Sequence, residues 1–406
     1  MLLRREPEGG VSPVMRYEEL VSLLDRNIAA LSGKACALSD WMAANPELSG
    51  EEFESSRRIV GILSEAGFAV EFPYGDLPTA FRAVAGPGTG SQVAILVEYD
   101  ALPEMGHACG HCVSGAMSVL AALALADLVG EAGGTLSVVG TPAEEVDGAK
   151  CSMADKGLFD GYDLAIMIHA DAATSSPAFR SLAMDGYRFT FRGRPAHAAA
   201  APWEGVNALN GVQLLFHALD MLRQHIRPEA RIHGVIDAGG AAPNIVPEVA
   251  RCRFEFRAPT LDYLNGLRER CLDCARGAAL ATGTEVFWET FEASFDEIVP
   301  NPAGERMIEE IFRELGISFV PPSLPSGSTD MGNTSRRCPA LHPLLAITPR
   351  KVALHTRDFA AAVTEPEAHQ ALVAGARAIG RAVLRTFTDG ELRRAMRAVV
   401  PPRPVA

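Results

Sequence analysis

Cys109 and His111 stand on either side of a single glycine, within the segment Gly-His-Ala-Cys-Gly-His-Cys at residues 106–112. A thiolate and an imidazole are good ligands for a borderline-soft divalent ion. The glycine between them lets the backbone bring both side chains to one point. The pattern therefore predicts a metal-binding turn. A buried cysteine that only packs would also fit the pattern, as would a four-cysteine zinc site that pairs this turn with Cys271 and Cys274.

Further candidate ligands follow three apolar runs of strand length, each at the point where the run ends. Asp100 follows the run 93–97, Glu144 and Glu145 follow the run 135–140, and His169 follows the run 163–168. In an open α/β sheet, ligands bind beyond the carboxyl ends of the strands. A single Glu-Glu pair is usually a solvated acidic loop, but three strand ends with such residues indicate one site at the edge of a sheet.

Composition limits the kind of protein that carries this site. The chain has 406 residues, which favours two domains, and 48% hydrophobic with 21% charged residues is typical of a soluble globular protein. The net charge of -13 argues against nucleic acid as a partner. The most apolar window, 113–129, contains Ser114, Ser118 and Asp127, so we interpret it as a buried helix and expect no membrane span.

The same features predict a cytoplasmic protein. The N-terminus lacks the apolar core of a secretory signal. Eight cysteines at irregular spacing in a chain of this size are typical of reduced thiols.

Hydrophobic periodicity predicts the elements that must hold the strand ends in place. The expected helices are 17–44, 51–66, 113–129, 203–224, 261–281, 301–315 and 365–385. The other expected strands are 69–72, 80–84, 187–192, 231–237, 249–258, 284–289 and 344–347. From 187 to 289 the order is β-α-β-β-α-β, which predicts a ferredoxin-like unit.

The predicted fold is therefore α/β, with a mixed-sheet metal-binding domain and an inserted ferredoxin-like α+β domain. The expected divisions are an N-terminal arm at 1–16, a catalytic domain at 17–182 and 295–388, the inserted domain at 183–294, and a C-terminal tail at 389–406.

With these elements placed, the chain resembles the two-metal aminoacylase and carboxypeptidase family of metallopeptidases. Within it, the branch of aminobenzoyl-glutamate hydrolases and amino-acid amidohydrolases is the most similar. The resemblance runs from about residue 17 to 385 and rests on the shared order of motifs at 99–103, 106–111, 140–145, 196–199, 242–247, 328–333 and 355–356. It implies two divalent metal ions, manganese or zinc, held by Cys109 as the bridging ligand and by His111, Glu145, His169 and His355.

The resemblance also implies that the inserted domain at 183–294 serves as lid and dimerisation domain. In the family, the histidine that matches His197 reaches across a dimer and acts with the asparagine that matches Asn244 to stabilise an oxyanion, so a homodimer is expected. Arg257 is the expected clamp for a substrate carboxylate, because a guanidinium binds carboxylates in bidentate fashion. Ser326 and Ser328 are expected to add hydrogen-bond donors.

These residues predict hydrolysis of a C–N bond. Two divalent ions can share a water, lower its pKa and polarise a carbonyl. Glu144 matches the family's general base, which removes the proton and hands it to the leaving nitrogen. Asp100 is expected to orient a ligand histidine. The expected substrate is a small carboxylate, an N-acyl or aroyl amino acid such as aminobenzoyl-glutamate. Hydrolytic deamination of a substituted aminobenzoate by the same site, or an inactive ligand-binding relative, are the alternatives.

The chain departs from the family pattern at two positions beside the ligands. Cys112 replaces the usual aspartate or asparagine, and Ala170 replaces a proline. Neither change removes a ligand.

Overall fold

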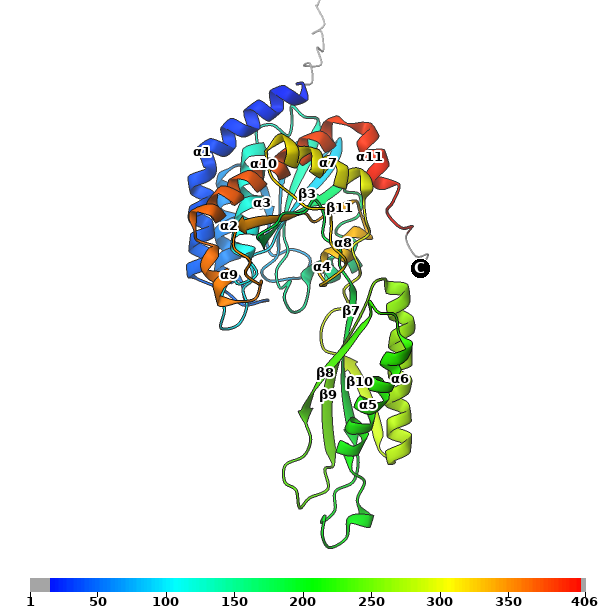
Figure 1. Ribbon diagram of the computed structural model, residues 1–406. Coiled ribbons are helices and arrows are strands. Elements are labelled where there is room, and N and C mark those ends of the chain that lie inside the picture. Colours follow the sequence, from blue (N-terminus) through cyan, green and yellow to red (C-terminus); the bar gives the residue numbers. More distant parts are fainter. Residues whose placement is uncertain (1–14, 403–406) are drawn as a thin grey trace, which may run out of the picture.

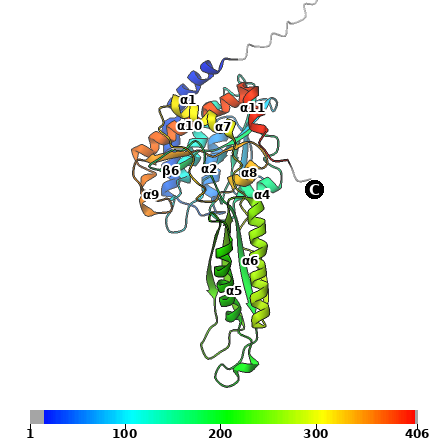
Figure 2. The same ribbon diagram turned by 45° about the vertical axis from the view of Figure 1, so that its right-hand side comes forward.

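The computed structural model describes residues 15–402 and consists of a rounded α/β unit and an elongated unit that projects from it (Figure 1). Residues 1–14 of the expected arm and 403–406 of the expected tail lie outside the described residues. The elongated unit begins with one long strand that leaves the α/β unit, and it keeps its separate outline when the molecule is turned (Figure 2).

A six-stranded mixed sheet forms the centre of the α/β unit, with the strand order β1-β2-β4-β3-β5-β11. The strands are β1 (Ala69–Glu71), β2 (Phe81–Ala85), β3 (Ser91–Val97), β4 (Gly134–Gly140), β5 (Leu164–Ile166) and β11 (Ala340–Leu341). β4, β3, β5 and β11 are parallel neighbours, whereas β2 runs antiparallel to β4. The carboxyl ends of the three strands with predicted ligands therefore lie side by side.

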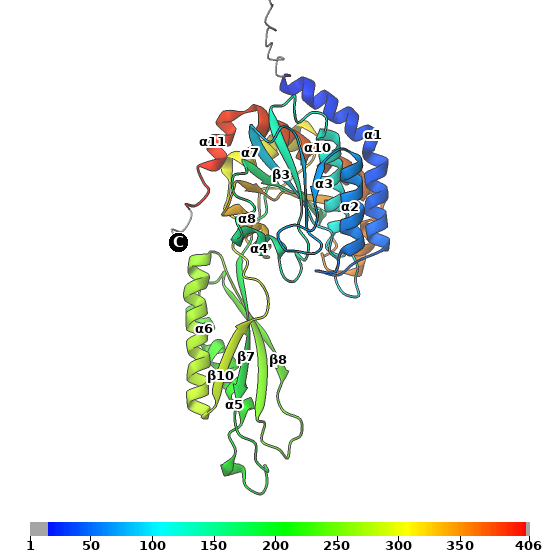
Figure 3. The same ribbon diagram turned by 180° about the vertical axis from the view of Figure 1, so that it is seen from behind.

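Helices and loops cover both faces of this sheet, which explains why its strands are continuous apolar runs. Val93 and Ile95 of β3 face one core, while Ala94 and Leu96 face another, as the two-residue period of a strand requires. The first core is closed by α1 (Tyr17–Ala44), α2 (Phe53–Glu65), α3 (His111–Leu125), α7 (Pro302–Glu314) and α10 (Pro366–Thr388). The second is closed by α4 (Ala149–Asp155) and α8 (Met331–Ser335); Figure 3 shows the molecule from behind.

A two-stranded parallel sheet, β6 (His169–Ala172) with β12 (Leu344–Thr348), lies beside the main sheet. We expected His169 at the end of a strand, but it is the first residue of β6 because the chain bends after β5 and pairs again with a different partner. α9 (Arg357–Ala362) follows the loop that carries His355.

The projecting unit has the predicted ferredoxin-like order. Its elements are β7 (Ala183–Arg192), α5 (Ala208–Leu222), β8 (Arg231–Ala238), β9 (Val249–Ala258), α6 (Leu261–Thr282) and β10 (Glu285–Thr290). The strands form one antiparallel sheet in the order β10-β7-β9-β8, and α5 and α6 cover one face around a separate hydrophobic core. The predicted fold class is confirmed.

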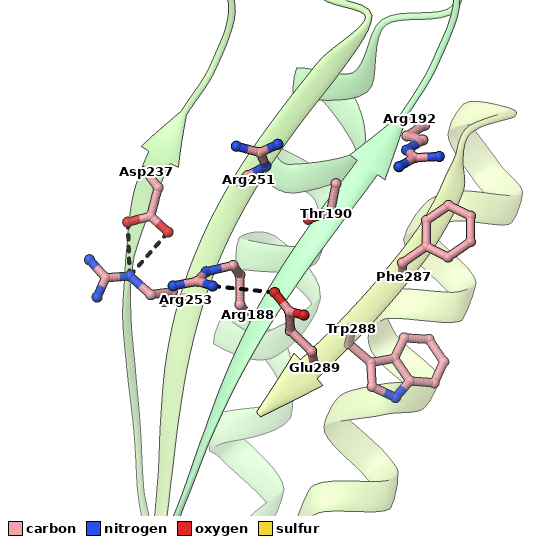
Figure 4. Close-up of a pocket in the computed structure, with 9 residues that line it drawn as sticks. All are labelled: Arg188, Thr190, Arg192, Asp237, Arg251, Arg253, Phe287, Trp288 and Glu289. Carbon is pink, nitrogen blue, oxygen red and sulfur yellow. Dashed lines mark hydrogen bonds and ion pairs between the residues drawn. The ribbon is translucent and has the colours of Figure 1, made fainter. Parts of the chain in front are cut away.

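The other face of this sheet carries a cavity of about 740 Å³ lined largely by arginines (Figure 4). Arg253 contacts Asp237 at 2.9 Å, and Arg188 contacts Glu289 at 3.2 Å, so two of the four arginines are neutralised by neighbouring strands. The guanidinium of Arg192 lies 5.0 Å from the ring centre of Phe287. The residues that line this cavity include none of the predicted metal ligands.

Part of the expected tail is ordered. Residues 390–397 form α11 (Gly390–Arg397), whose Met396 is buried and accepts a hydrogen bond at its carbonyl from the side chain of Asn301. Arg397 also contacts Asp163 at 3.0 Å. Across residues 15–402, no helix combines the length and the apolar character that crossing a bilayer requires.

Candidate metal centre

The turn between β3 and α3 holds two of the predicted ligands in a rigid position. Gly110 has φ 87°, a left-handed conformation that glycine adopts without cost, and α3 begins directly after it at His111. Four residues into the helix, a side-chain carbon at Gly115 would stand 2.2 Å from the carbonyl oxygen of Glu98. The absence of a side chain there lets α3 approach the end of β3, which places His111 against the acidic residues that follow the strand.

All five predicted ligands meet at this edge. Donor atoms of Cys109, His111 and His169 lie within 4.8 Å of one another, and the same holds for Cys109, Glu145 and His355. Cys109 belongs to both groups, as a bridging ligand must. The sulfur of Cys109 lies 3.5 Å from Nε2 of His169, and Nε2 of His355 lies 3.5 Å from Oε1 of Glu145.

The donor set fits two divalent ions. Nε2 of His111 and Oε1 of Glu145 are buried atoms without a hydrogen-bond partner in the described chain, and buried polar atoms without partners are costly. Both point into the groups of donors named above. Sulfur, imidazole nitrogen and carboxylate oxygen are together the ligand types that zinc accepts.

Asp100 has the geometry expected of a residue that orients a ligand. Its Oδ1 lies 2.9 Å from Nδ1 of His111, so the opposite ring nitrogen of that histidine is turned toward the metal groups. Its Oδ2 accepts hydrogen bonds from Ser49 and from the backbone N–H of Glu145. Burial alone would raise the pKa of Asp100, but the adjacent His111 holds it well below its usual range.

The two adjacent glutamates have different surroundings. Glu145 faces His355 and belongs to the group around Cys109. Glu144 lines the same cavity but makes no hydrogen bond or ion pair with the described chain. Burial, followed by repulsion from Glu98 and Asp330, raises the pKa of Glu144 well above its ordinary value. Donor atoms of His111, Glu144 and Glu145 also lie within 4.8 Å of one another, so Glu144 is within reach of an ion as well as of the cavity. Glu145, which shares a further group with Cys109 and His355, is the better placed ligand of the two.

A buried lysine beneath the site was not predicted. The side chains of Lys150, Glu98 and Asp330 are all completely buried, and Nζ of Lys150 lies 2.6 Å from Glu98 and 2.7 Å from Asp330. The other oxygen of Glu98 lies 3.3 Å from Nε2 of His111. A lone lysine has no sequence signal that separates it from a surface lysine, although Glu98 at the end of β3 could have been included with Asp100.

Three further residues of the site were also missed. The cavity in front of the ligands, about 420 Å³, is lined among others by Asp171, Phe179 and His342, in addition to Ser326, Ser328 and every predicted ligand except His111. The rings of His342 and His169 are 5.6 Å apart. The signal for Asp171 was available, because residues two apart on a strand face the same side and His169 was already a candidate.

The residues predicted on the projecting unit are not gathered at this centre. His197 and Asn244 are exposed in neighbouring loops, with backbone pairing between His197 and Ile245. These loops lie beyond the far end of β7, a ten-residue strand that spans about 30 Å at 3.3 Å per residue. Arg257 lies at the near end, where Nη2 contacts Glu255 at 2.7 Å and Nη1 donates to Ser328 Oγ at 3.4 Å.

The departures from the family pattern leave the centre intact. Cys112 is fully buried, and burial raises the pKa of its thiol to about 12, so it stays neutral. The backbone N–H of Ala170 donates to Ser114 Oγ at 2.9 Å, a bond that a proline at this position could not make. Cys112 belongs to the core of the α/β unit, whereas Cys271 belongs to the core of the projecting unit, so a four-cysteine zinc site is not formed.

Comparison with known proteins identifies the family. Residues 183–281 match the M20 family model described as the peptidase dimerisation domain. Xaa-Arg dipeptidase from Mus musculus is 36% identical over 365 residues, which cover 85% of this chain and 84% of the relative. The chain belongs to the M20 peptidase family.

Other M20-type proteins agree with this assignment. One of the subunits of p-aminobenzoyl-glutamate hydrolase from Escherichia coli is 32% identical over 319 residues, covering 74% of this chain and 66% of that protein. A solved Bacillus subtilis structure, described as a dinuclear metal binding peptidase from the M20 family, has a TM-score of 0.68 at 17% identity and covers 88% of this chain and 99% of that one. As an M20 protein, this chain is a metal-dependent hydrolase that acts on C–N bonds.

Proposed function

We propose that this M20 enzyme cleaves the amide bond of a small N-acyl, aroyl or aminoacyl amino acid. The observation that carries the proposal is the convergence of Cys109, His111, Glu145, His169 and His355 on two overlapping donor groups, with the unpaired Glu144 in the same cavity. A protein that only bound a ligand would have no need for a complete ligand set together with a free base.

Glu144 is the proposed general base. The bound ions supply an activated water and polarise the substrate carbonyl. Glu144 accepts the proton of the attacking water and delivers it to the leaving nitrogen. Its lack of hydrogen bonds with the described chain leaves both oxygens available for this exchange, and it lines the cavity together with Cys109, Glu145, His169 and His355. Asp100 keeps His111 oriented throughout.

Arg257 is the proposed clamp for the carboxylate of the amino-acid half. It reaches Ser328, which lines the cavity, and it is held by Glu255 on the same strand. A substrate carboxylate would replace Glu255 as its partner. Ser326 and Ser328 would add hydroxyl donors. The names of two relatives, an Xaa-Arg dipeptidase and an aminobenzoyl-glutamate hydrolase, both describe substrates with such a carboxylate.

We infer that His197 acts on the site of a second subunit. The match to a dimerisation domain and the separation of His197 from the ligands within one chain support a homodimer joined through the projecting units. β8 is an unpaired edge of its sheet, and Val235 on it is 54% exposed. Met221 on the adjacent α5 is 67% exposed, so apolar surface is available for a partner.

Several finer features complete the proposal. The nitrogen, sulfur and oxygen donors fit manganese or zinc.

The proposed domain boundaries lie at 182/183 and 294/295, because the segment between them has a hydrophobic core of its own. All eight cysteines are free thiols, which supports a cytoplasmic location.

Incubation of the manganese- or zinc-loaded enzyme with dipeptides, N-acyl amino acids, p-aminobenzoyl-glutamate and substituted aminobenzoates tests the reaction. Amino-acid release and ammonia release are followed in parallel. The proposal expects amino-acid release from at least one amide. Ammonia from an aminobenzoate, without cleavage of any amide, would establish deamination instead.

Subunit mixing tests the contribution of the partner. His197→Ala and Glu144→Gln subunits should each be inactive alone, because one lacks the oxyanion donor and the other lacks the base. A hybrid dimer contains one intact site and should recover up to about half of the activity per hybrid. Verified subunit exchange without recovery would show that His197 does not act on the site of the partner subunit.

A further inference from the structure

Apart from the metal ligands and the base, few of the residues that line the catalytic cavity are charged. Its remaining polar lining is mostly neutral: Ser323, Ser326, Ser328 and Thr329 carry hydroxyls. Burial lowers the pKa of His342 to about 3, so that ring is uncharged. Phe179, Leu344 and Leu354 supply apolar surface. Among the described lining residues, Asp171 is then the one charged side chain that neither the ligand set nor the base includes.

The fold places Asp171 beside the reaction centre. It belongs to β6, two residues after His169, so both side chains leave the strand on the same face. Two residues of strand span about 6.6 Å, which is within the length of one small substrate. Pairing of β6 with β12 at Leu344 and Ala346 holds this register.

Asp171 has no cation to neutralise it. Its Oδ1 accepts a hydrogen bond of 2.7 Å from the backbone N–H of Ala172, and it forms no ion pair within the described chain. Its side chain is partly buried in the lining of the cavity, away from bulk water. A carboxylate in such a position is stabilised when a cation is brought to it.

We propose that Asp171 is a specificity-determining residue that binds a cationic group of the substrate, an ammonium or a guanidinium. The inference rests on the proposed amidohydrolase function. Arg257 donates to Ser328, which lines the cavity, and Asp171 lines the same cavity, so the site offers opposite charges for the two charged ends of a zwitterion. It therefore favours a substrate with both a carboxylate and a cation over an acyl amino acid with a carboxylate alone.

Two parts of a dipeptide could supply the cation: the free α-amino group of the first residue, or a basic side chain on the second. Four substrates separate them. N-acetyl-leucine carries neither cation, alanyl-leucine carries the amino group, Nα-acetyl-lysine carries the side chain, and alanyl-lysine carries both. We would measure kcat/KM for each with metal-loaded wild type, Asp171→Asn and Asp127→Asn. The last removes the same charge from an exposed position outside the cavity and serves as the control.

The expected result is a loss of about 10- to 100-fold in kcat/KM for Asp171→Asn with the substrates whose cation contacts Asp171, the scale of one hydrogen bond to a charged group. N-acetyl-leucine should change by less than about twofold, and Asp127→Asn should match the wild type throughout. A loss on alanyl-leucine assigns the α-amino group, and a loss on Nα-acetyl-lysine assigns the side chain.

Three outcomes would overturn the inference. Equal losses on neutral and cationic substrates, or a fall in metal content of Asp171→Asn, would show that Asp171 supports His169 instead of the substrate. No change in kcat/KM for Asp171→Asn with any of the four substrates would show that Asp171 has no role in selection. A wild type that cleaves amides but prefers N-acetyl-leucine would also refute it while the proposed function stands. Failure of the wild type to cleave any amide would instead refute the proposed function.

Discussion

Lys150 offers the sharpest test of the electrostatics under the metal centre. The side chains of Lys150, Glu98 and Asp330 are all completely buried. Replacement of Lys150 by methionine keeps most of the side-chain volume but removes the cation between the two carboxylates. Breaking a buried ion pair by removing one partner costs about 3–5 kcal/mol, because a charge is left without compensation. For a unit of this size, each kcal/mol lowers the melting temperature by roughly 2–3 °C. We therefore expect Lys150→Met to melt about 6–15 °C below the wild type.

The pH dependence of this loss has a defined direction. Although burial opposes ionisation, Lys150 and then His111 lower the pKa of Glu98 to about 2 in the folded protein, below its ordinary value of 4.5. In the wild type, this stabilisation is present above pH 4.5 and disappears as the pH falls toward 2. Without Lys150, uptake of protons by the buried carboxylates lowers the free-energy cost of their uncompensated negative charge. The difference in melting temperature should therefore be smaller at pH 5 than at pH 8.

Differential scanning calorimetry of the chelated and the metal-loaded protein would measure both effects. Lys156→Met is the matched control, because Lys156 is six residues away and pairs with an Asp76 side chain that is 91% exposed. Such surface pairs contribute at most about 1 kcal/mol. A drop of less than 2 °C for Lys150→Met, or one equal to that of the control, would refute the reasoning.

Three other predictions follow from the same structure. Cys109→Ala should lose most of its bound metal and its activity, since Cys109 belongs to both donor groups. Metal analysis after dialysis and an amide-hydrolysis assay would measure the two losses, and full retention of either property would contradict the bridging role. Glu144→Gln should keep its metal while kcat falls by about 10²-fold or more, whereas Glu145→Gln should lose metal; equal metal loss in both variants would reverse the assignment. Burial raises the pKa of Glu292 to about 7, so its charge opposes folding increasingly as the pH rises from 4.5 through 7. Glu292→Gln should therefore melt above the wild type at pH 8 and level with it near pH 5, and a difference that is constant with pH would count against this.

Elements with a strong local pattern could be predicted from the sequence. The first helix was expected at 17–44 and is found at Tyr17–Ala44, because its apolar residues recur with a helical period and Pro46 follows its end. The ferredoxin-like order was also predictable, since its strands alternate and its helices are long. The candidate ligands could be named because each follows an apolar run or stands in a motif shared with a known family, and the structure brings their donor atoms together.

Features that depend on contacts distant in the sequence were not predictable in this way. The break between β5 and β6 depends on the pairing of β6 with β12, about 175 residues later. Lys150 becomes a buried counterion only because α8 brings Asp330 to it across 180 residues. The amphipathic pattern of α11 was overlooked because its arginines suggested a solvated tail, yet they lie around one buried methionine.

The charge of the centre explains why so many carboxylates can be buried together. Glu98, Asp100, Glu144, Glu145 and Asp330 gather at one sheet edge, and among the described residues Lys150 is their one permanent cation, which leaves four negative charges in excess. In the chain alone His111 meets part of this excess: burial opposes its protonation, but Cys109 and the adjacent carboxylates raise its pKa well above the ordinary value. Two divalent ions would bring four positive charges while a ligating Cys109 thiolate would add one negative charge, so the ions would offset most of the excess and a ligating His111 would be neutral. An arrangement that would be unstable as a bare cluster is in this way compatible with a bound pair of divalent ions.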